Sequence, residues 1–161
     1  MKMQRNLRGM EKVIKNLHKE IKAIKGRSMK GLILASIIVR RDMEDTSPKV
    51  PVDYGNLRSS WFVVTSTGSI ESGASPKFEG PNANELSAAH ADAVSSAKAL
   101  ARLRNEPVLV MGFGANYAIW VHENVGGTFA RPGSGAKFFE AALKRNEKQM
   151  LEIIRLNAKI Q

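Results

Sequence analysis

The 161-residue chain contains no cysteine. Disulfide bonds and thiolate-bound zinc are therefore excluded, and the fold must be held together by packing. The lack of cysteine does not identify the redox state of the compartment. With 43% hydrophobic residues, the sequence is long enough to build one core and too short for two comfortable ones. We expect a single domain over residues 1–161.

Long hydrophobic runs are also missing. The longest run, GLILASIIV at 31–39, falls short of the roughly 18 residues that a membrane-spanning helix needs, and it is followed by Arg40 and Arg41. The N-terminal region is basic, but its apolar residues are spaced among lysines instead of forming the core of a signal peptide. We expect neither a membrane span nor an export signal.

Motifs for catalysis and for metal or cofactor binding are absent as well. His18, His90 and His122 are not spaced as zinc ligands, and no HExxH pattern occurs. GFGANY lacks the third glycine of a dinucleotide-binding loop, GSGAK lacks the ending of a phosphate-binding loop, and no GxSxG surrounds a serine. We expect no enzyme activity, no metal and no cofactor, and we interpret the histidines as structural or interface residues.

Positive charge is abundant and unevenly distributed. The formal net charge is +10, and residues 1–30 hold ten Lys or Arg against two Glu, so 10 − 2 = +8 lies in this segment. Such a surface attracts polyanions. A solvated helix face gives the same lysine spacing, however, and the segment offers no aromatic residues for stacking on bases. Both interpretations remain open for the candidate contacts with DNA or an acidic partner: Lys12, Lys15, Lys19, Lys22 and Lys25.

The first 45 residues are predicted to form a basic helical segment. Between residues 5 and 25 apolar residues recur every three or four positions, which is the pattern of an amphipathic helix. The repeat is too short for an independent coiled coil, so the stripe is expected to pack on its own domain or on a neighbouring subunit. Its members are Leu7, Met10, Ile14, Leu17, Ile21 and Ile24.

The second part of this segment has a different pattern. Gly26 and Ser28 favour a bend. Residues 29–43 are apolar nearly all round, which predicts a helix buried on several sides, and Pro48 and Pro51 follow it.

The rest of the chain predicts a small sheet with further helices. Residues 59–67 and 107–113 have the composition of strands. Residues 72–106 combine a loop with an alanine-rich helix, which we expect to be exposed or inserted. Lys137–Ala158 has the spacing of a closing amphipathic helix. This order predicts an α+β fold with helices flanking a small antiparallel sheet.

A dense motif, PVDYGNLRSSW at 51–61, precedes the first strand. A small hydrolase site could be imagined at Asp53, Arg58 and the serines, but no catalytic motif supports it. We interpret the motif as a turn that leads into the strand. Asp53 would cap backbone amides, Gly55 would supply a permissive backbone angle, and Leu57 would face the core. Arg58 would reach a carboxylate or a carbonyl, and Glu123 is the favoured partner.

This motif and a second one, YAIWVHENVGGTFARPGSGAKFFEAAL at 117–143, together resemble two signatures of a tailed-bacteriophage family. The family comprises the neck or tail-completion proteins of the head–tail interface, also called minor capsid or morphogenesis proteins. Tyr54 stands where the first signature usually has threonine, and His122 is an extra residue relative to the shortest form of the second. The matching structural or interface residues are Val52, Asp53, Gly55, Leu57, Arg58, Ser60, Tyr117, Ala118, Val121, Glu123, Gly127 and Phe138.

The resemblance implies a structural virion protein without catalysis. Such a subunit forms a closed homo-oligomeric ring, expected to be a hexamer, in the neck of the virion after assembly in the host cytoplasm. Its partners would be a portal-side head-completion or connector protein and a tail terminator or tail tube protein, with double-stranded DNA passing non-specifically through the lumen and no membrane involved. The alternative from another class is a small basic, sequence-tolerant nucleic-acid-binding protein.

Overall fold

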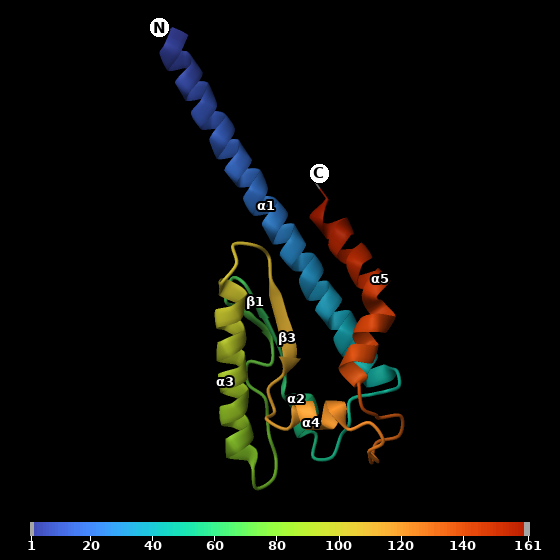
Figure 1. Cartoon of the computed structure of the whole chain (residues 1–161). Coiled ribbons are helices and arrows are strands. Elements are labelled where there is room, and N and C mark those ends of the chain that lie inside the picture. The colour runs from blue at the N-terminus through green and yellow to red at the C-terminus, as the bar shows by residue number, and fades with distance from the viewer. Residues whose placement is uncertain (1, 160–161) are drawn as a thin grey trace.

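The computed structural model describes residues 2–159, and their side chains from residue 10 onward. It confirms the predicted α+β fold, with a long N-terminal helix, a small antiparallel sheet and a C-terminal helix (Figure 1). The elements in chain order are α1 Lys2–Asp45, α2 Asn56–Ser59, β1 Trp61–Thr65, β2 Ile70–Ser72, α3 Ala83–Arg102, β3 Leu109–Phe113, α4 Ala118–Glu123 and α5 Phe138–Ala158.

The sheet has three strands in the order β2-β1-β3, and all its pairs are antiparallel. The central strand β1 aligns with β3 from Trp61 opposite Phe113 to Thr65 opposite Leu109. The edge strand β2 was not predicted from the sequence. Its three residues are too few to show an alternation, and only the pairing with β1 defines it as a strand.

Side chains of β1 alternate between two cores. Trp61 and Val63 join the larger cluster, to which α1 and α5 contribute, whereas Phe62 and Val64 join a smaller cluster with residues of α3. This follows from the two-residue period of a strand, which sends successive side chains to opposite faces. The molecule therefore has three layers, with α3 on one face of the sheet and α1 with α5 on the other (Figure 1).

The alanine-rich helix α3 is not exposed all round, because one of its faces is buried. It covers the second face of the sheet, and its buried residues include His90 and Val94. The nitrogen Nε2 of His90 lies 2.7 Å from the carbonyl oxygen of Gly73, so Nε2 is the donor. The prediction of an exposed helix was wrong because the thin apolar stripe of α3 is still wide enough to cover a three-stranded sheet.

Helix α1 runs without interruption through Gly26 and Ser28 and stays straight in Figure 1. The predicted bend is therefore absent. A single glycine lowers helix propensity by about 1 kcal/mol but keeps its backbone donor, so the hydrogen-bond ladder can continue through it.

Burial of α1 is one-sided in its second half. Ala35, Val39 and Met43 are buried, but Leu34 and Ile37 remain exposed. The prediction of a helix buried on several sides was therefore wrong, because α5 and the sheet lie on one side of α1 and nothing described covers the other. Across residues 2–159, no helix combines the length and hydrophobicity that a bilayer-crossing segment needs.

Gly31 marks the close approach of α1 and α5. A Cβ atom at this position would lie 2.9 Å from Cα of Ile154. We expect Gly31→Ala to destabilise the protein by about 1 to 3 kcal/mol, because two helix backbones must move apart. The matched control is Gly26→Ala, where a Cβ meets nothing within 4 Å and where alanine should stabilise the exposed helix by about 0.5 to 1 kcal/mol. Urea unfolding of both variants tests this, and equal effects would contradict the close approach.

Candidate functional site: a cavity between the two motif segments

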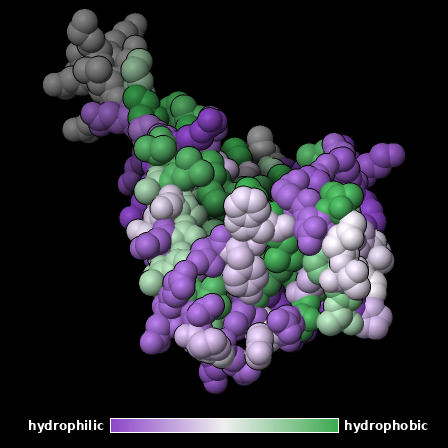
Figure 2. All heavy atoms as spheres, turned by 60° about the horizontal axis from the view of Figure 1, so that its bottom comes forward, coloured by the Kyte–Doolittle hydropathy of each residue, from purple (hydrophilic) through white to green (hydrophobic). Residues whose placement is uncertain are grey.

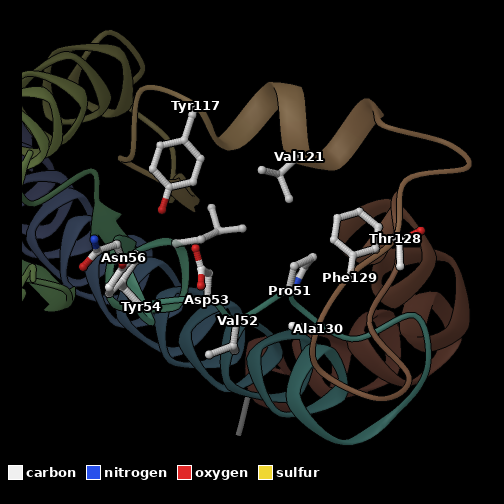
Figure 3. Close-up of a pocket in the computed structure, with 11 residues that line it drawn as sticks. Pro51, Val52, Asp53, Tyr54, Asn56, Tyr117, Val121, Thr128, Phe129 and Ala130 are labelled. Atoms are coloured by element: carbon white, nitrogen blue, oxygen red, sulfur yellow. The ribbon is translucent and has the colours of Figure 1, made fainter. Parts of the chain in front are cut away.

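The two motif segments, far apart in the sequence, face each other across a cavity of about 380 Å³. Figure 3 shows residues from the turn after α1 on one side and residues from α4 and the following loop on the other. The lining is Pro51, Val52, Asp53, Tyr54, Asn56, Leu57, Tyr117, Val121, Thr128, Phe129 and Ala130.

The first motif folds as a tight turn followed by the single-turn helix α2. Gly55 precedes α2 with a φ of 83°, a left-handed conformation that favours glycine. Leu57 is buried in the main core, and the hydroxyl of the buried Ser60 donates to the carbonyl of Leu57 at 2.7 Å. The predicted roles of Gly55 and Leu57 are confirmed.

Asp53 does not cap α2. The helix starts after Gly55, and no side-chain hydrogen bond caps its N-terminus within the described chain. The predicted cap was wrong because the left-handed glycine, and not a side chain, sets the start of the helix. Asp53 is exposed and extends instead toward the space that Tyr117 faces (Figure 3).

Both burial and a nearby charge change the pKa of Tyr117. Burial raises the pKa of Tyr117 above its usual value, and the negative charge of Asp53 raises it further. A hydrogen bond with the backbone of Leu57 acts in the opposite direction. The phenol is therefore kept in its neutral form beside the carboxylate.

We expect Asp53→Asn to lower the pKa of Tyr117 toward its usual value, since the nearby negative charge is removed. The chain has only two tyrosines, so a Tyr54→Phe background leaves Tyr117 as the one phenol to titrate. Ultraviolet absorbance of phenolate against pH measures the shift. An unchanged titration curve would contradict the proximity of the two groups.

Arg58 does not pair with Glu123. Its Nη1 lies 3.8 Å from Oε2 of Glu44, while Glu123 pairs with Lys137 and His122. The predicted partner was wrong because α2 follows the end of α1 and places Arg58 near the last turns of that helix. Hydrogen bonds from Lys137 and then His122 lower the pKa of the exposed Glu123.

Glu44 is a centre of charge that the sequence did not indicate. Its carboxylate lies 2.9 Å from Nη2 of Arg40 and 3.0 Å from Nη1 of Arg131. Arg131 also donates to the carbonyls of Glu44 at 2.9 Å and Val50 at 3.2 Å. Arg131 thereby attaches the loop after α4 to the end of α1 and fixes one wall of the cavity. No periodic pattern surrounds Arg131, so only the tertiary structure reveals this role.

The remaining motif residues serve the scaffold. Ala118 and Val121 pack from α4 against the main core, and Phe138 is buried at the start of α5. At Gly127 a Cβ would collide with the side chain of Asn124. Val52 is half-buried in the wall of the cavity.

The lysines predicted to meet DNA or an acidic partner lie on α1. Lys12, Lys15, Lys19 and Lys22 are exposed. Lys25 is partly buried, and its Nζ donates to the backbone and side-chain oxygens of Asn105 at 2.7 and 3.1 Å. Four of the five lysines are therefore open to a partner, and the fifth attaches α1 to the loop before β3.

The lining of the cavity is mostly apolar. Its walls combine aliphatic and aromatic side chains with the carboxylate of Asp53. Within residues 2–159 no group of three or more His, Asp or Glu residues could hold a metal ion. Comparison of the chain with protein-family models, with curated proteins and with solved structures gives no match.

Proposed function

We propose that this protein is a structural subunit of the neck of a tailed bacteriophage, part of a ring between the portal-side connector and the tail. The resemblance of the two motifs motivates the proposal. One structural observation supports it most: the N-terminal half of α1 projects from the body and carries large apolar side chains on its surface (Figures 1 and 2). Met10, Ile14, Leu17 and Ile21 are between 42 and 60% exposed.

Such a helix needs a partner. Contiguous exposed apolar surface on a soluble subunit marks a surface for association. A second set of large apolar side chains is exposed at the other end of the molecule, on and after α4: Ile119, Trp120 and Val125. A subunit that contacts its own copies and also the rings above and below needs several such surfaces. DNA that passes through the lumen of such a ring needs no base-specific contacts.

Light scattering of the purified, nuclease-treated protein over a range of concentrations and salt tests the proposal, followed by electron microscopy of the largest species. We expect rings with a central opening. Random duplex DNA, added in a second series, should bind weakly, with steep salt dependence and without sequence preference.

The exposed lysines of α1 favour one second candidate, a basic nucleic-acid-binding protein. A persistent monomer that binds duplex DNA tightly, whatever the DNA sequence, would support this candidate and contradict the neck assignment. Light scattering and DNA binding together therefore distinguish the two proposed functions.

A further inference from the structure

The apolar stripe of α1 lies on the same helix face that, further along α1, packs against α5 and is buried. Steps of three or four residues lead from Ile24 through Ser28 to Gly31, where α5 packs closely, and on to the buried Ala35 and Val39. Residues three and four apart share one helix face. Helix α5 ends at Ala158, next to this part of α1, so the same face is left uncovered further toward the N-terminus. The uncovered members are Met10, Ile14, Leu17 and Ile21.

We call residues 10–24 the basic arm, since lysines flank this stripe. The segment contains Lys12, Lys15, Lys19 and Lys22 against two glutamates. Within residues 1–30 the formal charge is +8, so the arm lies in the most basic part of the chain.

An acidic groove lies at the other end of the molecule. The motif cavity adjoins a second cavity of about 430 Å³, and the two share Asp53, Tyr54, Asn56 and Tyr117 in their walls. The second cavity adds the exposed carboxylates of Glu79 and Glu85. None of the described residues that line the two cavities is a lysine, arginine or histidine. In a chain of net charge +10, this local excess of carboxylates is unusual.

We propose that the acidic groove receives the basic arm of a second copy of this chain. Apolar side chains spaced three and four residues apart would enter the two cavities, as amphipathic helices do in grooves, and the flanking lysines would face the carboxylates. The arm and the elements α2 and α4 that carry the groove lie at opposite ends of the molecule (Figure 1), so an arm does not reach the groove of its own chain. The contact is therefore head-to-tail, and such a contact gives a closed ring when the rotation from one copy to the next completes a circle.

Pairing of two arms with each other explains the stripe less well. It would bring the lysines of both copies together along a seam of about two heptads, where like charges destabilise the pair. Binding of the arm to DNA alone accounts for the lysines but gives no partner to the apolar side chains. Only the acidic groove complements both features of the arm.

Two variants test this docking, which rests on the proposed ring. The arm variant, Ile14→Ser with Leu17→Ser, has an intact groove. The groove variant, Glu79→Lys with Glu85→Lys, has an intact arm. All four positions are exposed, so both variants should fold. A control with the same change in charge outside both cavities is Asp92→Lys with Glu147→Lys, also at exposed positions.

Analytical ultracentrifugation of nuclease-treated samples measures the outcome. We expect each variant alone to self-associate at least about tenfold more weakly than the wild type, and the control to assemble normally. Mixing the two variants should give a 1:1 dimer, because one intact arm then meets one intact groove and no further contact can form. High salt should weaken that dimer.

A mixture that stays monomeric would overturn the docking, as would normal assembly of either variant alone. If the wild type still forms rings in that case, the rings use other surfaces and the proposed neck function stands. If the mixture forms the dimer but the wild type never closes into rings, the docking stands and the neck function fails.

Discussion

Replacing Phe138 with alanine is expected to lower the free energy of unfolding by about 3 to 5 kcal/mol, the range for removing a buried phenylalanine. Phe138 is 1% exposed. Its ring lies edge to face with Phe113 at 5.5 Å and with His122 at 5.1 Å between ring centres. The residue therefore joins β3, α4 and the start of α5, and a cavity at this point loosens three elements at once.

Urea unfolding followed by circular dichroism measures this loss. The matched control is Leu151→Ala on the same helix. Leu151 is 60% exposed, so its truncation should change the free energy of unfolding by about 0.5 kcal/mol or less. Similar losses for both variants would show that the buried junction contributes no more than an exposed position on α5.

The second large effect is expected for Gly73→Ala. Gly73 has a φ of 77°, and a Cβ atom there would overlap the carbonyl oxygen of Trp61 and lie 2.9 Å from Cα of Phe62. Neither obstacle is a flexible side chain. The left-handed conformation and the overlap together should cost roughly 2 to 5 kcal/mol, because the loop must leave β1 and the hydrogen bond from His90 to Gly73 is strained.

The control Gly80→Ala distinguishes the cost of the left-handed conformation from the cost of the overlap with β1. Gly80 also has a positive φ, of 86°, but a Cβ there meets nothing within 4 Å. This control should therefore show only the conformational cost, about 1 to 2 kcal/mol. Thermal and urea unfolding of both variants give the comparison. Equal losses would mean that contact with β1 adds nothing at Gly73.

Much of the fold could be predicted from local patterns. The long helix, the strand that begins at Trp61 and the closing helix follow from residue spacing and composition, since an element with one buried face repeats its apolar residues at a fixed period. Strand β2 and the covering role of α3 could not be predicted in this way. Both depend on a neighbour, the central strand β1, and not on their own sequence.

The candidate site was predictable only in part. The sequence pointed to Gly55 and Leu57 correctly, because a turn before a strand constrains both residues locally. It paired Arg58 with the wrong carboxylate and gave no indication of Arg131. The partners of a charged side chain can lie far apart from it in the chain. Here the loop after α4 approaches the end of α1, and the tertiary structure therefore determines which carboxylate each arginine meets.

The sequence by itself determined the kinds of the longer elements, the basic charge of the first 30 residues and the apolar stripe among the lysines, because periodicity and composition are local properties. Only the tertiary structure decided that α5 ends beside Gly31 and leaves this stripe uncovered. It also decided that the two motifs enclose one cavity with carboxylates around it. Both features arise where distant segments pack together, and no local pattern encodes which segments those are.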